Sequence, residues 1–168
     1  MPEKVMPGPV SDCSGIREAV CIHTRKIFDS CRDKDCIEDL RFYPKLQCVD
    51  IINRALSVKG GSAKLLYVYV DVEPVSFNRG FYTVDMRFFY HVTLQAYLSC
   101  PVPVTVEGLC VFDKRAILFG SEGSAKVFTS KVNAQGGDLQ GLPATNAPTA
   151  VVESVDPIIL GMKLVDVC

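Results

Sequence analysis

The chain has 168 residues, of which 48% are hydrophobic, and it carries 18 Lys and Arg against 19 Asp and Glu. This length suits one domain with a hydrophobic core of its own. The balanced charge gives no electrostatic attraction to nucleic acid or to an anionic membrane, so we expect neither as a partner. No apolar run approaches the roughly 18 residues of a membrane span. We therefore expect the high apolar content to be covered within an assembly.

Residues 1–60 form a cysteine-rich segment that we expect to belong to the same domain as the residues after it. Five of the eight cysteines lie here, around one of the two histidines. The first ten residues contain no apolar stretch typical of a signal peptide, so we expect synthesis in the cytoplasm without export. Asp33 is placed to begin a short helix ending near Asp39, and 49–56 fit a helix or a strand.

The N-terminal cysteines suit three kinds of chemistry. Cys21, His23, Cys31 and Cys36 offer the four ligands that tetrahedral zinc requires, although their spacing lacks the paired knuckles of structural zinc sites. Disulfides are the second reading, and buried reduced thiols the third, which suits Cys100 and Cys110 beside or within expected strands. The candidate cross-linking residues are Cys13, Cys21, Cys31, Cys36, Cys48 and Cys168. We expect no resident cofactor.

Catalysis has little support in the sequence. Cys21 and His23 would share one face of a strand, but no further group accompanies them as a nucleophilic site requires. His91 lies on the polar side of an expected strand, and 120–126 lack the order of a phosphate-binding loop. We therefore predict no catalytic residue, while a small enzyme with a pocket inside the β domain stays a third alternative.

Residues 61–130 have the pattern of an antiparallel β-sandwich core. Residues 64–72 are apolar on both faces, which predicts a strand buried on both sides. Residues 81–98 alternate apolar and polar side chains for so long that we expect a bulge or bend to divide them. Residues 104–119 predict a hairpin that turns at Asp113 and Lys114, and 125–130 predict one more strand.

The C-terminal part reads as a tethered strand. Residues 131–149 are rich in Gly, Ala, Asn and Pro, with few large apolar groups, and predict a flexible linker. Residues 150–168 become apolar again and predict a strand. Such a strand can pair within its own chain or with a neighbouring chain.

Four stretches together resemble a family of uncharacterised cysteine-containing proteins from anaerobic spore-forming bacteria. They are VCIHTRKIFDSCRDKDCIEDLR, VDVEPVSFNRGFYTVDMRFFYHVT, EGLCVFDKRAILFGSEGSAKVF and VVESVDPIILGMKL. The middle strands, among them LLYVYVDV, also resemble the repeated β domain of spore-coat proteins. The resemblance implies a spore setting and assigns no catalytic residue.

These observations lead to one hypothesis about function. We expect a self-assembling structural protein of a spore envelope layer, appendage or lattice, whose partners are other copies of itself and other envelope proteins. Strand addition and disulfides would join the subunits, and the protein would end in the spore envelope or on the spore surface. The alternative is a cytoplasmic zinc-binding or thiol-based regulatory module.

Overall fold

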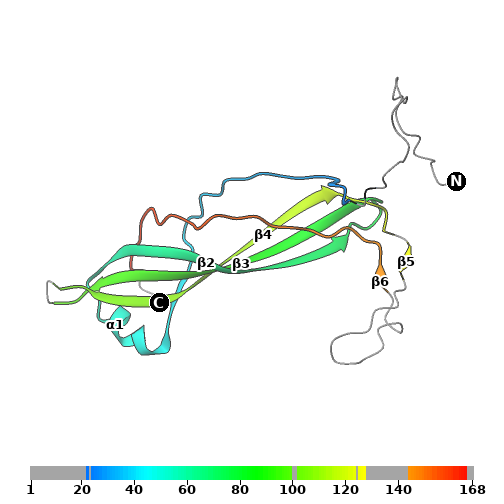
Figure 1. Ribbon diagram of the computed structural model, residues 1–168. Coiled ribbons are helices and arrows are strands. Elements are labelled where there is room, and N and C mark those ends of the chain that lie inside the picture. Colours follow the sequence, from blue (N-terminus) through cyan, green and yellow to red (C-terminus); the bar gives the residue numbers. More distant parts are fainter. Residues whose placement is uncertain (1–21, 23, 100–101, 124, 128–143, 166–168) are drawn as a thin grey trace, which may run out of the picture.

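The computed structural model describes residues 22, 24–99, 102–123, 125–127 and 144–165. The fold is mainly β, as the sequence predicted (Figure 1). In chain order, the elements are β1 (Phe42–Pro44), the one-turn 3-10 helix η1 (Leu46–Cys48), α1 (Val49–Asn53), β2 (Ser57–Pro74), β3 (Phe81–Tyr97), β4 (Val104–Phe119), β5 (Lys126–Val127) and β6 (Ala144–Thr145). Four strands form one antiparallel sheet in the order β1-β4-β3-β2, and β5 pairs with β6 separately.

Strand β3 explains why the sheet has one apolar face. Its even-numbered residues point to one side because side chains alternate along a strand. Seven of them are buried: Tyr82, Val84, Phe88, Tyr90, Val92, Leu94 and Ala96. Val106 and Cys110 of β4 and Cys48 beside α1 complete the buried set. The core is therefore a single layer of side chains along this face.

The expectation that a bulge or bend divides 81–98 is wrong, because the irregularities lie on the neighbouring strand β2. β3 runs for 17 residues without an interruption, while β2 departs from regular register between Gly60 and Ala63 and again between Leu65 and Tyr67. A bulge inserts a residue on one strand of a pair and increases the local twist. The irregularities on β2 therefore let the long strands pair over their whole length.

The predicted hairpin at Asp113 and Lys114 is wrong. Both residues lie in the middle of β4, where Asp113 is opposite Arg87 and Lys114 is opposite Met86. Their polar side chains resemble a turn sequence, but each side chain has a partner that stabilises it within a strand: Arg87 for Asp113, and Asp33 and Asp35 for Lys114.

The prediction that 64–72 is buried on both sides is also wrong. These residues belong to β2, which lies at the end of the sheet with only β3 beside it. Tyr67 and Tyr69 are 61% and 51% exposed on the face opposite the core. The tyrosines that made the segment look buried are amphipathic and lie on an open sheet face.

Of the two segments before β2 for which the sequence allows a helix, 49–56 contains a helix and 33–39 does not. The part of 49–56 that fits a helix does form α1, at Val49–Asn53. The helix expected over 33–39 is absent, because this stretch is extended and Asp33 and Asp35 both bind Lys114. Residues two apart point to the same side of an extended chain, whereas a helix would separate them.

Two extended segments lie over the apolar face of the sheet (Figure 1). We name residues 24–41 the N-terminal strap and residues 146–165 the C-terminal strap. Within the described part of the chain, residues 24–41 and 147–165 form no backbone–backbone hydrogen bond and no strand. The segment predicted as a tail strand is therefore extended but unpaired where it is described, and most of the predicted linker lies outside the described residues.

The described residues thus contain a four-stranded sheet with a strap layer on one face, and the opposite face is open. None of their helices is long and apolar enough to cross a membrane. The second sheet of the expected sandwich is not among the described residues.

Candidate functional site: an apolar groove beneath two straps

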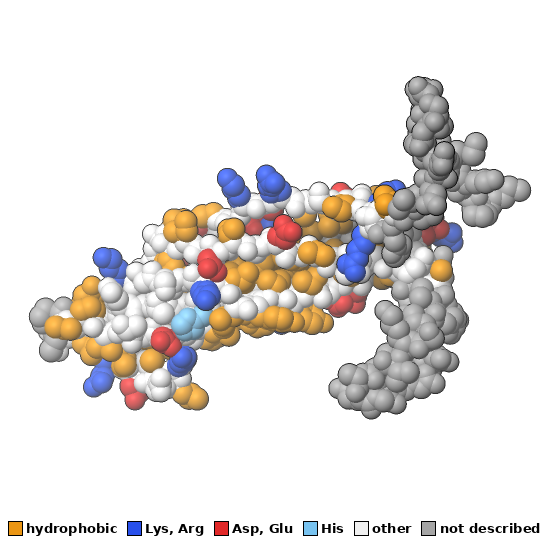
Figure 2. Space-filling model, in the orientation of Figure 1, with side chains coloured by type: hydrophobic (Ala, Val, Ile, Leu, Met, Phe, Trp, Pro, Cys, Tyr) orange, Lys and Arg blue, Asp and Glu red, His pale blue; other side chains and the backbone are white. Residues whose placement is uncertain are grey.

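A large apolar groove lies between the sheet and the two straps. Its floor is formed by core-facing side chains of the central strands, and its walls by the straps. The floor includes Val84, Met86, Phe88, Tyr90, Cys110 and Phe112. Figure 2 shows hydrophobic side chains exposed in the middle of the molecule, beside the straps. The volume is about 2750 Å³, beyond the roughly 300–1,000 Å³ of small-molecule sites.

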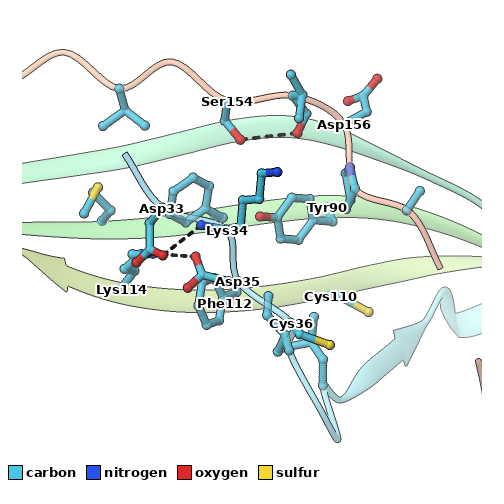
Figure 3. Close-up of a pocket in the computed structure, with 18 of the residues that line it drawn as sticks. Asp33, Lys34, Asp35, Cys36, Tyr90, Cys110, Phe112, Lys114, Ser154 and Asp156 are labelled. Carbon is cyan, nitrogen blue, oxygen red and sulfur yellow. Dashed lines mark hydrogen bonds and ion pairs between the residues drawn. The ribbon is translucent and has the colours of Figure 1, made fainter. Parts of the chain in front are cut away.

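The N-terminal strap is held by one lysine of β4. Lys114 Nζ lies 2.7 Å from Asp33 Oδ2 and 2.5 Å from Asp35 Oδ2 (Figure 3). The hydrogen bond from Lys114 lowers the pKa of Asp33 and, reciprocally, the Asp33 carboxylate raises the pKa of Lys114. Further along the strap, Asp29 Oδ2 accepts a hydrogen bond from the Phe119 N–H at the end of β4. Carboxylates therefore fasten this strap to the sheet.

The C-terminal strap is held over the same face of the sheet, at the edge strand β2. Asp156 Oδ1 accepts a hydrogen bond from the Leu65 N–H of β2 at 2.8 Å. Ile159 packs over Gly60, where an added Cβ would lie 2.6 Å from its Cγ2 atom. Val152 and Met162 also pack against the core cluster. Lys163 Nζ lies 2.7 Å from Asp39 Oδ1 and joins the two straps.

The outward side of the C-terminal strap is also apolar. Val151 is 78% exposed, Val155 is 86% exposed, and Ile158 and Leu160 are each 84% exposed. These side chains point away from the core that Val152 and Ile159 contact. An extended segment that is apolar on both sides can contact its own core and a second apolar surface at the same time.

Exposed large hydrophobic residues outnumber buried ones by about two to one in the described part of the chain. Twenty-one are exposed, while ten hydrophobic residues are buried in the core. Single exposed apolar side chains are ordinary, but grouped ones indicate an interaction surface. The groups here are the outer side of the C-terminal strap and the exposed residues Leu66, Tyr67 and Tyr69 on β2.

The titratable groups on the groove floor are poorly suited to catalysis. Burial raises the pKa of the Tyr90 hydroxyl, with a smaller contribution from the Asp35 carboxylate. Burial also raises the pKa of the Cys110 thiol. Both groups are therefore protonated at neutral pH, and a protonated thiol is a weak nucleophile.

The predicted cysteine sites fall into three groups. Cys31 and Cys36 are exposed thiols on the N-terminal strap, and Cys36 and Cys110 both line the groove (Figure 3). Cys48 and Cys110 are buried and form no disulfide among the described residues. The remaining predicted sites lie outside the described residues: Cys13, Cys21, Cys100 and Cys168.

The proposed zinc ligands are only partly described. Cys31 and Cys36 are five residues apart on the N-terminal strap, and Cys21 and His23 lie outside the described residues. Among the residues that the structure describes, no three His, Cys, Asp or Glu side chains gather as metal ligands.

The open face of the sheet carries a regular set of ion pairs. Arg115 Nε lies 2.5 Å from Asp85 Oδ1, and Arg87 Nε lies 2.6 Å from Asp113 Oδ1. Each arginine donates two hydrogen bonds to its carboxylate, which lowers the pKa of both aspartates. His91 lies on the same face, with Nε2 3.5 Å from Glu107 Oε2. This arrangement agrees with the surface position predicted for the histidine.

The sequence analysis missed the groove and the edge of β2. The groove joins Asp33, Lys114 and Asp156, residues so distant in the chain that only the fold places them along one face. The edge had a readable signal, because uncharged LLYVYV is bounded by Lys64 and Asp71. Charged residues next to a β-prone run are typical of an edge strand.

Comparison with protein-family models, with curated proteins and with solved structures finds no match to this chain. The groove, the straps and the sheet edge are therefore the features that bear on function.

Proposed function

We propose that the protein is a self-assembling structural subunit, joined to other copies by strand addition and by disulfides. The observation that carries this proposal is the doubly apolar C-terminal strap. Its outer residues Val155, Ile158 and Leu160 are more than 80% exposed, and its backbone from 147 to 165 has no backbone partner within the described chain. Both features suit a segment that packs against a neighbouring subunit.

The hydrophobic effect supplies the driving force for this association. Burial of apolar surface contributes about 25 cal/mol per Å². A second sheet placed over the straps would also complete the sandwich expected from the sequence, with one layer from each of two subunits. The assembly would then hold a core that each chain alone only half covers.

Disulfides between subunits would stabilise the assembly after it forms. Cys31 and Cys36 are exposed on the N-terminal strap and accessible to another chain. Cys48 is buried and would need local opening first. Removal from the reducing cytoplasm is needed for such bonds to persist.

The resemblance to proteins of spore-forming bacteria supports a place in the spore envelope. In that setting, a protein made in the mother-cell cytoplasm is oxidised when that cell lyses. The proposed class is therefore a structural protein of an envelope layer, appendage or lattice, with itself and other envelope proteins as partners.

Electron microscopy and sedimentation velocity of the purified full chain test this proposal. We expect filaments, sheets or closed oligomers, and multimers on non-reducing gels that decrease with reductant. Polar substitution of the outer strap side chains, Val155→Ser with Ile158→Ser and Leu160→Ser, is expected to weaken assembly and leave the circular dichroism of the sheet unchanged.

The matched control is Leu46→Ser, because Leu46 is 95% exposed but lies in η1, outside the C-terminal strap. It should leave assembly unchanged. A wild-type chain that stays monomeric at all concentrations, with and without oxidant, would contradict the proposal.

A further inference from the structure

Strand β2 is an open edge of unusual length. It has 18 residues, with β3 on one side and no strand on the other side in the described part of the chain. Long, apolar edge strands readily pair with another strand, and natural proteins usually shorten, charge or cover them. Residues 65–70 of β2, LLYVYV, carry no charge.

As an edge strand, β2 has backbone N–H and C=O groups that face away from β3. The Leu65 N–H does not bond to β3, since it donates to Asp156 Oδ1 on the outer side of β2. The Asp156 carboxylate thus occupies one edge donor, and a pairing strand would take its place at Leu65. Figure 2 shows hydrophobic side chains along the lower margin of the molecule, in the region that β2 occupies in Figure 1.

The register of β2 makes the edge complementary to itself. The irregularity between Leu65 and Tyr67 leaves Leu66 outside the ladder, since Leu65 is opposite Tyr90 and Tyr67 is opposite Phe89. If Leu66 is left out of the count, residues at equal distances before and after Val68 point to the same face of the sheet. Tyr67 matches Tyr69 on the open face, and Leu65 matches Val70 on the core face.

The next positions are opposite in charge. Lys64 and Asp71 lie at equal ladder distances from Val68, and both side chains are exposed on the open face. Neither forms an ion pair within the described chain, and Asp71 lies opposite another carboxylate, Asp85. The two charges therefore lack partners of opposite sign at the positions where an antiparallel copy of β2 would supply them.

We propose that two copies of this chain pair through β2, antiparallel and symmetric about Val68, to form one continuous eight-stranded sheet. Lys64 of each copy then lies opposite Asp71 of the other, and Tyr67 lies opposite Tyr69. Opposite charges and aromatic side chains in directly opposed positions stabilise a strand pair. Two-fold symmetry closes this interface, since the same patch serves both copies. The pairing ends near Pro74, which has no N–H to donate.

This inference rests on the proposed function, because it names one surface through which the subunits associate. Pairing through β2 does not use the outer side of the C-terminal strap, which stays a separate surface for association. The dimer through β2 is then the unit that larger assemblies contain.

A charge-swap experiment tests the register. Lys64→Asp and Asp71→Lys each place like charges opposite each other at both ends of the pair, and each should weaken dimerisation at least about tenfold. The double variant again places a lysine opposite an aspartate at both ends of the pair, and it should regain wild-type affinity. A mixture of the two single variants should form heterodimers, which native mass spectrometry distinguishes by mass.

Lys59→Asp is the matched control, since it changes an exposed lysine of β2 outside the symmetric stretch and should not alter the dimer. All measurements are made in reductant, with circular dichroism to verify the sheet. Single variants that dimerise like the wild type would overturn the pairing through β2 while assembly through the strap still stands. A wild-type chain that never associates would remove both this inference and the proposed function.

Discussion

Lys114 Nζ on β4 and Asp33 Oδ2 on the N-terminal strap form an ion pair at 2.7 Å across 81 positions of sequence. The Lys114 side chain is 19% exposed, so it spans the layer between sheet and strap. This pair, with Asp35, is the main polar connection between the strap and β4 in the described residues. It also makes the strap sensitive to pH.

We expect acid to release the N-terminal strap. The pKa of Asp33 in the folded chain is lowered from 3.8 by Lys114. The contribution of Asp33 to the stability of the folded state is therefore fully present above its pKa in the unfolded chain. It is lost as the pH falls through the lowered pKa in the folded chain. NMR NOE contacts between residues 24–41 and β4, followed from pH 6 to pH 2, should be lost as the strap is released. In Lys114→Met these contacts should already be weak at pH 6, with little further change on acidification.

Leu94→Ala should destabilise the sheet by about 2–5 kcal/mol, because the side chain is 2% exposed and its removal leaves a cavity. Urea unfolding followed by circular dichroism measures the free energy of unfolding. Leu46→Ala at a 95% exposed position is the control and should change it by less than about 0.5 kcal/mol. Equal effects of the two substitutions would contradict the assignment of the core.

Gly108→Ala should displace β1 from the sheet. A Cβ at this position would lie 2.3 Å from the Tyr43 carbonyl oxygen and 2.5 Å from Phe42 Cζ. No rotamer relieves a contact with backbone, so we expect a loss of about 1–3 kcal/mol in unfolding free energy. Gly161→Ala has open space around the added Cβ and should be neutral. Cross-peak shifts confined to β1 and β4 in NMR spectra would verify the local cause.

The thiols should differ in reactivity according to burial. In the native reduced chain, a maleimide should label Cys31 and Cys36 rapidly and label Cys48 and Cys110 only after denaturation. Peptide mapping by mass spectrometry identifies each labelled site. Rapid native labelling of Cys110 would show that the groove floor is open to reagents, against its 6% exposure.

The sequence predicted the central strands because their signal is local. Alternation along 81–98 reports directly which face of β3 is buried. Residues 75–80 connect β2 to β3 in a short turn, with hydrogen bonds from the Val75 N–H to the Phe81 carbonyl and from the Phe81 N–H to the Asn78 carbonyl. In these places the residue pattern and the tertiary structure favour the same conformation.

The errors arose where tertiary partners override local preference. Asp113 and Lys114 have turn propensity, yet Arg87, Asp33 and Asp35 stabilise them within a strand. The groove could not be predicted, because its walls come from both ends of the chain and only the fold brings them together over the sheet. The two-fold complementarity of β2 depends on Leu66 leaving the ladder, which alternation alone does not reveal.

The straps form no backbone ladder to the sheet, and this separates the molecule into parts of unequal local stability. Opening a segment that lacks ladder hydrogen bonds costs less than opening β3, which is paired on both sides. In the assembly that we propose, the cover would lift while the sheet stays folded, and a subunit would exchange its own strap for a neighbour's apolar surface without first unfolding.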